Sequence, residues 1–265
     1  MKKKCSSKNE CCLTPMNVIA DSHVGLVREC NEDSYIYCVN KGNKNALVAV
    51  ADGIGGHEGG DIASALSLQV LASAWRNSKY PNLTKKEDLH RFLVKNIKKG
   101  NRIIHGLNHS YKIQHPMGTT IVSGIFSPKH LLLAHAGDSR CYRLRNDILL
   151  QLTEDHSYVA ELVKNNLISP EEARNHPFSH IISRSVGPAP TLDVELNMYE
   201  LQKGDRYIFC SDGMTAHLDD FEIETILMDA DDPYSAVKEL MYSSLRGGGD
   251  DNITIIAVYI NNDKP

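Results

Sequence analysis

The chain has 265 residues, of which 42% are hydrophobic and 23% are charged, a composition typical of a globular protein with one sizeable core. Its 29 basic and 33 acidic residues give a net charge of −4, which argues against nucleic acid as a partner. No apolar run is long enough for a membrane span and the opening MKKKCSSKNECC does not resemble a signal peptide, so we expect a soluble, cytoplasmic protein without a membrane partner.

The first half of the chain predicts strands followed by two helices. Residues 1–14 form a polar lead-in, and residues 15–262 contain no Pro/Gly/Ser-rich linker, so we interpret them as one domain. Apolar residues at helical spacing predict a helix that begins near Asp61. A second long helix is expected to begin at Thr84, where Thr84 and Glu87 match a capping box. The strands predicted before these helices are Val18–Ala20, Tyr35–Val39 and Ala46–Ala51.

The second half predicts more strands, an insert, and two further helices. The insert, at about residues 155–187, contains a short helix at Tyr158–Lys164 and another that opens at Ser169, and we interpret it as a flap. The helices near the end are expected at Asp220–Met228 and Pro233–Leu245. The predicted strands are Thr119–Phe126, Leu131–Ala136, Cys141–Leu144, Ile148–Leu152, Leu192–Tyr199, Arg206–Cys210 and Ile253–Ile260.

This order of elements indicates an α+β fold. Strands come in blocks that are separated by pairs of helices, whereas a parallel sheet would require strict alternation of strand and helix. We therefore expect two antiparallel sheets flanked by helix pairs, a four-layer α-β-β-α sandwich.

The cysteines do not suggest a disulfide framework. There are seven, an odd number, and none belongs to a C-x-x-C pair. Cys11 and Cys12 are adjacent, while Cys141 and Cys210 lie within apolar runs. This spacing predicts reduced thiols and gives no zinc site.

Acidic residues lie where the predicted strands end. Asp52, Asp138 and Asp212 each come shortly after an apolar run and beside a glycine, and Asp251 stands just before the last strand. Each could be an ordinary turn residue, since Asp-Gly is a common turn dipeptide. If the strands are neighbours, however, the four carboxylates converge, and they can stay ionised together only around a cation. Oxygen ligands of this kind select Mg²⁺, Mn²⁺ or Ca²⁺.

A segment between the first two strands adds a cation to this acidic set. Residues 21–34 carry Arg28 close to Glu32 and Asp33. An Arg side chain can bind two phosphate oxygens at once, although a loop salt bridge would explain the same pattern.

These segments together resemble the protein phosphatase 2C family of metal-dependent Ser/Thr phosphatases, in its bacterial form. The resemblance runs from about residue 17 to residue 260. The matching segments, in order, are GLVRECNEDS (25–34), VAVADGIGGHEGGDIAS (48–64), MGTT (117–120), AHAGDSRCYRL (134–144), LTEDHSYVAEL (152–162), IISRSVG (181–187), FCSDGMT (209–215) and GGDDNIT (248–254).

The resemblance implies a centre of two or three Mn²⁺ or Mg²⁺ ions. Asp52 would bridge two metals, and the backbone carbonyl of Gly53 would bind one of them. Asp212 and Asp251 would complete the ligands of the first metal, and Glu32 would serve the second. The family's Asp-Asn pair selects Asp251 rather than its neighbour Asp250.

The same resemblance implies roles for three further residues. Asp33 would hydrogen-bond metal-bound water, and Arg28 would hold the substrate phosphate. Asp138 would help to hold a third metal together with Asp212. The general acid stays unassigned, because Ile54 occupies a position where animal enzymes have His; His57 and metal-bound water are both candidates.

The expected activity is hydrolysis of phosphoserine and phosphothreonine in proteins by a metal-activated water that attacks in line. The expected partners are phosphoprotein substrates and an opposing Ser/Thr kinase, and we expect a monomer. No cysteine has Arg six positions on, which removes the cysteine-based phosphatase mechanism. A metal-dependent phosphodiesterase and a non-catalytic binding module are alternatives, the second disfavoured because every expected ligand is present.

Overall fold

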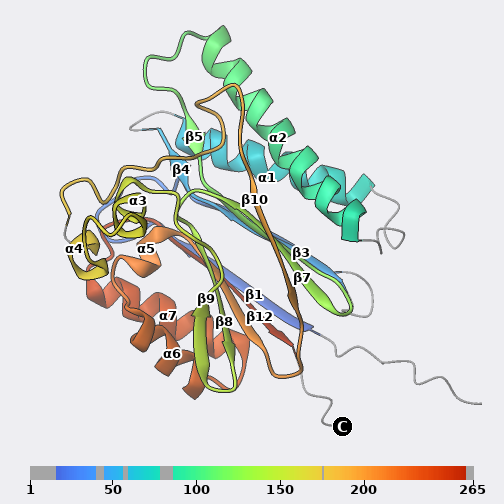
Figure 1. Cartoon of the computed structure of the whole chain (residues 1–265), viewed down its shortest axis with the longest axis vertical. Helices are drawn as coiled ribbons and strands as arrows, with labels where there is room; N and C mark the ends of the chain where they lie inside the picture. The colour runs from blue at the N-terminus through green and yellow to red at the C-terminus, as the bar shows by residue number, and fades with distance from the viewer. Residues whose placement is uncertain (1–15, 40–44, 56–58, 78–85, 175, 261–265) are drawn as a thin grey trace, which may run out of the picture.

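Two five-stranded antiparallel sheets face each other at the centre of the molecule, with helices on both outer sides (Figure 1). This computed structural model describes residues 16–39, 45–55, 59–77, 86–174 and 176–260. The predicted lead-in at residues 1–14, the capping residue Thr84 and His57 lie outside the described residues. The expectation of an α+β sandwich is confirmed.

One sheet joins the two ends of the described chain. Its order is β1-β12-β11-β8-β9, and all neighbours are antiparallel. In the β1–β12 pair, Met16 lies opposite Ile260 and His23 lies opposite Ile253. The strands are β1 (Met16–His23), β12 (Ile253–Ile260), β11 (Arg206–Cys210), β8 (Arg140–Arg145) and β9 (Ile148–Gln151).

The other sheet has the order β10-β7-β6-β3-β2, again antiparallel throughout. A separate two-stranded ribbon pairs β4 (Gly53–Ile54) with β5 (Gly118–Thr119). The structure divides the predicted strand Thr119–Phe126 between β5 and the next strand, which begins at Ile121. The break is at Thr120, whose backbone N–H donates to the carbonyl oxygen of Asp52. The strands of the large sheet are β10 (Glu195–Glu200), β7 (His130–Ala136), β6 (Ile121–Phe126), β3 (Ala46–Ala51) and β2 (Ser34–Val39).

The outer layers are two helix pairs. Helices α1 (Gly60–Asn77) and α2 (Lys86–Ser110) cover the β3 sheet, and α6 (Asp220–Asp229) and α7 (Pro233–Gly247) cover the β12 sheet. Strand β3 shows why its sequence is a continuous apolar run: all six residues are buried. Its odd-numbered residues face α1 and α2 while its even-numbered residues face the other sheet, so neither face needs polar side chains.

The insert between β9 and β10 contains two short helices, as predicted. Helix α3 (Tyr158–Lys164) begins after Ser157, whose hydroxyl accepts from the backbone N–H of Ala160. Helix α4 (Pro170–Arg174) begins with the expected capping box, in which Ser169 and Glu172 each bond the other's backbone N–H. A one-turn helix that the sequence did not predict, α5 (Asp212–Thr215), directly follows β11.

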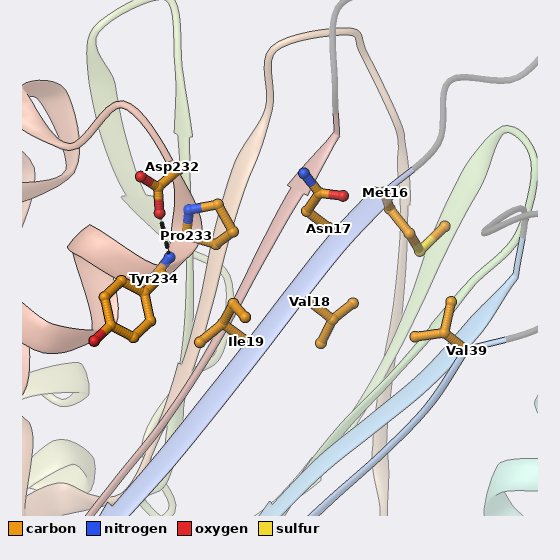
Figure 2. Close-up of a pocket in the computed structure, with 8 residues that line it drawn as sticks. All are labelled: Met16, Asn17, Val18, Ile19, Val39, Asp232, Pro233 and Tyr234. Carbon is orange, nitrogen blue, oxygen red and sulfur yellow. Dashed lines mark hydrogen bonds between the residues drawn. The ribbon is translucent and has the colours of Figure 1, made fainter.

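The far end of the β1–β12 pair, where Met16 lies, has a small pocket between β1, β2 and the start of α7 (Figure 2). Tyr234 lies there in the first turn of α7, beside the capping residue Asp232. Among the described residues, no helix is both long and apolar enough to cross a membrane.

Candidate metal centre

Five acidic residues from distant parts of the chain meet at the end of the two sheets. They interact electrostatically with one another, and the Asp52 carboxyl donates a hydrogen bond to the Asp212 carboxylate. They come from the loop before β2, the ends of β3 and β7, the start of α5 and the residue pair before β12. The five are Asp33, Asp52, Asp138, Asp212 and Asp251.

Thr120 holds two of these strand ends together. Its hydroxyl accepts a hydrogen bond from the backbone N–H of Asp52 (3.0 Å) and lies 2.7 Å from the hydroxyl of Ser139, the residue after Asp138. Gly137, on the other side of Asp138, has φ +119°, and a Cβ there would lie 2.6 Å from Thr120 Cγ2. The glycine therefore lets the turn that carries Asp138 pack directly against Thr120.

Asn252 organises the loop that precedes β2. Its Oδ1 accepts from the backbone N–H of Glu32 (2.7 Å), and its Nδ2 donates to the carbonyls of Val24 and Cys30. Sequence reasoning did not select Asn252, although it stands in the matched segment GGDDNIT. It fixes Glu32 and Asp33 relative to the residues just before β12.

Glu32 lies against a close contact between two glycines. A Cβ on Gly53 would be 2.5 Å from the backbone of Gly60, and a Cβ on Gly60 would be 2.8 Å from Glu32 Oε2. Only glycines permit this approach. The carboxylate of Glu32 is thereby brought to the turn that follows Asp52.

Arg28 brings a positive charge to the same place. Its Nη2 donates to Asp251 Oδ2 at 2.8 Å, and about half of its side chain is exposed. A guanidinium has five N–H donors, so most of them remain for an incoming anion.

Burial and mutual repulsion change the protonation of these acids. Desolvation, reinforced by Asp212 and Asp251, raises the pKa of Asp33 to about 7. Desolvation and the charge of Asp212 raise the pKa of Asp138 to about 8. The same causes raise the pKa of Asp52, and burial also raises that of Asp212. The carboxylates repel one another, so they cannot all stay ionised at one site unless a cation compensates their charge.

The donor set fits hard divalent cations. It consists of carboxylate oxygens, the ligands that Mg²⁺ and Mn²⁺ prefer. Asp33 Oδ1 and Asp138 Oδ1 are buried and have no hydrogen-bond partner among the described residues. A buried polar atom without a partner is costly; a bound cation would satisfy Asp138 Oδ1, and water brought in with such a cation would satisfy Asp33 Oδ1.

A second group of polar residues attaches the flap to the Asp138 turn. His156 N donates to the Gly137 carbonyl (3.0 Å), and the Gly137 N–H donates to His156 Nδ1 (3.2 Å). Asp155, beside His156, binds the guanidinium of Arg140 with both carboxylate oxygens. Sequence reasoning did not select these residues; the signal for them was the matched segment LTEDHSYVAEL.

His135 and Glu195 complete this group around His156. The two imidazole rings are stacked, parallel and 4.7 Å apart between centroids, and His156 Nε2 is 3.2 Å from Glu195 Oε2. Although three potential metal ligands come together, an ion in the plane of one ring would lie outside the plane of the other. In this arrangement the group joins the flap to the sheets by hydrogen bonds.

Comparison with known proteins agrees with this geometry. The sequence model of the family "Protein phosphatase 2C" matches residues 22–246. The serine/threonine phosphatase stp of Listeria innocua is 36% identical over 237 residues, which are 89% of this chain and 93% of the relative. The serine/threonine protein phosphatase PstP of Mycobacterium tuberculosis is 38% identical over 89% of this chain and 43% of its own length.

Solved structures show the same fold. The S. agalactiae serine/threonine phosphatase superposes with a TM-score of 0.86 at 32% identity, over 93% of this chain and 100% of that chain. The catalytic domain of PstP in complex with two manganese ions gives a TM-score of 0.80 at 33% identity, over 93% and 99% of the two chains. The chain therefore belongs to the protein phosphatase 2C family.

Proposed function

We propose that this protein hydrolyses phosphoserine and phosphothreonine in proteins, with water attacking phosphorus in line with the leaving oxygen. The observation that carries the proposal is the convergence of five Asp carboxyls beside the exposed guanidinium of Arg28. Two of these carboxyls have a buried oxygen with no hydrogen-bond partner in the part of the chain that the structure describes. The manganese in the PstP structure supports the same reading of the acidic cluster.

The resemblance to the family suggests how the acids would divide into ligand sets. Asp52, Asp212, Asp251 and the carbonyl of Gly53 would hold a first Mn²⁺ or Mg²⁺, with Asp52 shared by a second that Glu32 also serves. Asp138, with Asp212, would hold a third. Bound there, such cations supply a water of lowered pKa and neutralise charge on the phosphoryl oxygens.

The side chains around the cluster position the reactants. Arg28 presents its free N–H donors to the phosphate oxygens, which fixes the orientation of the phosphoryl group. Asp33 accepts a hydrogen bond from Ser211 at Oδ2 (2.7 Å) and keeps Oδ1 available to accept one from the attacking water. The water oxygen forms the new bond to phosphorus and gives up one proton. The bond from phosphorus to the Ser or Thr oxygen breaks, and the leaving oxygen takes up one proton, so that the products are the alcohol and inorganic phosphate.

Three further expectations from the sequence accompany this proposal. We propose residues 15–262 as one catalytic domain that acts as a monomer in the cytoplasm. Its substrates would be phosphoproteins made by an opposing Ser/Thr kinase.

The test is release of phosphate from a phosphothreonine peptide by purified protein with Mn²⁺, with Mg²⁺ and with EDTA. Asp212→Asn serves as the control, because it removes one charge from the cluster at nearly constant volume. Metal-dependent turnover that this variant lacks is the expected result. A folded wild-type protein without phosphatase activity under any metal condition would contradict the proposal.

A further inference from the structure

Three aromatic rings form an exposed cluster on the flap. The rings of Tyr158, His176 and Phe178 lie 5.7 to 6.2 Å apart between centroids, so each contacts the other two. Tyr158 is 40% exposed and Phe178 is 50% exposed, and the neighbouring Ile181 is 42% exposed. Single exposed apolar residues are common, but a contiguous aromatic group at the surface usually marks a binding site.

The cluster is held in place by the backbone. Tyr158 N donates to the Ile181 carbonyl (2.8 Å), and Ile181 N donates to the Phe178 carbonyl (3.1 Å). Phe178 N in turn donates to His176 Nδ1 (3.2 Å). Ser157 and Ile182, next to these residues, form an antiparallel bridge. A partner would therefore meet rings whose positions are already set, and it would pay little entropy to order them.

The cluster is close to the candidate metal centre. Tyr158 is two residues from His156, which is bonded twice to Gly137, the neighbour of Asp138. Standard backbone dimensions put Tyr158 at most about 16 Å from Asp138, a span of about five residues of extended peptide. A peptide whose phosphorylated residue lies at the acids can therefore reach the rings.

We propose that Tyr158, Phe178 and Ile181 form a subsite for an apolar side chain of the phosphoprotein substrate, within about five residues of the phosphorylated Ser or Thr. The inference rests on the proposed function and adds a sequence preference to it. Tyr158, Phe178 and Ile181 offer aromatic and aliphatic surface, so the subsite they form selects by apolar contact.

Phosphothreonine peptides of Gly and Ser test the proposal, with one Leu or Phe moved through the five positions on each side. For wild-type protein with Mn²⁺, we expect kcat/KM to rise about tenfold when the apolar residue stands at a favoured position. In Phe178→Ser and in Tyr158→Ser, the ratio of kcat/KM for the apolar peptide to that for the all-polar peptide should fall towards one. Most of the loss should be in KM.

Tyr234→Ser is the matched control, because Tyr234 is also an exposed tyrosine in the first turn of a helix, at the far end of β1 (Figure 2). Its peptide preference should equal that of the wild type. A wild-type enzyme that hydrolyses 4-nitrophenyl phosphate but shows no apolar preference would overturn the subsite and leave the proposed function intact. A protein that hydrolyses neither compound would overturn both.

Two other results would also overturn the subsite. One is a preference that persists in both flap variants. The other is a wild-type dimer in sedimentation that Phe178→Ser dissociates, since the cluster would then be a surface between two copies of this chain.

Discussion

Replacing Asp33 by Asn is expected to stabilise the metal-free protein, and to do so more at pH 8 than at pH 5. The reason is the pKa of Asp33, which burial raises from 3.8 to about 7. Between these values the folded protein holds a proton that the unfolded chain has released. The free energy of unfolding therefore falls as pH rises towards the pKa of Asp33 in the folded protein. The Asn variant does not show this fall, because its side chain does not titrate.

The size of the effect follows from the same pKa. Between pH 5 and pH 7 the wild type loses about 1.4 kcal/mol per pH unit through this group, or roughly 3 kcal/mol by pH 8. For a chain of this size, that free energy corresponds to on the order of 10 °C in melting temperature. The gap in melting temperature between Asp33→Asn and wild type should widen by about this amount from pH 5 to pH 8. Excess Mn²⁺ should narrow the gap, because a bound cation favours the ionised form of Asp33 in the wild type.

Thermal unfolding followed by circular dichroism, in EDTA at pH 5, 6.5 and 8, measures the gap. Asp232→Asn is the control. Backbone N–H groups at the start of α7 lower the pKa of Asp232, so this residue is ionised in both folded and unfolded states throughout the range. A gap for Asp33→Asn that stays constant with pH, or narrows as pH rises, would refute the account of the buried cluster.

Three further substitutions test separate parts of the site. Arg28→Ala should raise KM for a phosphopeptide about tenfold with a smaller change in kcat, because it removes the group proposed to orient the phosphate; steady-state kinetics equal to wild type would exclude Arg28 from the substrate site. Asp138→Ala should raise the Mn²⁺ concentration needed for half-maximal activity, while calorimetry still detects two bound ions; loss of all binding would contradict a separate third position. Gly137→Ala should cost about 3 kcal/mol or more in urea unfolding, because its Cβ would overlap Thr120 and its φ is positive. Gly106→Ala, where the new Cβ would meet no described atom within 4 Å beyond its own stretch of helix, should instead gain up to about 1 kcal/mol. Equal effects of the two substitutions would contradict the strain argument.

Strong local patterns in the sequence predicted most helices and strands. The apolar run Ala46–Ala51 became the fully buried β3, and Ser169 with Glu172 formed the expected capping box. The convergence of Asp52 with Asp212 was also predictable, because each follows a buried strand and strands of facing sheets can end at the same edge. In these cases the pattern lies within a few residues of the element that it specifies.

Other features depend on contacts between distant residues and left no local pattern. Strands β4 and β5 have two residues each, too few for any periodicity, and they exist because Gly53 meets Thr119. The role of Asn252 depends on carbonyl groups more than 200 residues away in sequence. Likewise, nothing near His156 shows that its ring will accept a hydrogen bond from Gly137.

The pairing of β1 with β12 has a consequence for how the protein folds. Eight residues at the start of the described chain pair in antiparallel register with eight at its end, with Met16 opposite Ile260. This sheet can close only after the whole intervening chain has been made, and such a high contact order predicts slow folding. Asp251 and Asn252, just before β12, then reach Arg28 and Glu32 only in that late step. A truncated or nascent chain that already contains the β3 sheet would therefore still lack an assembled metal centre, so activity should appear only with completion of the fold.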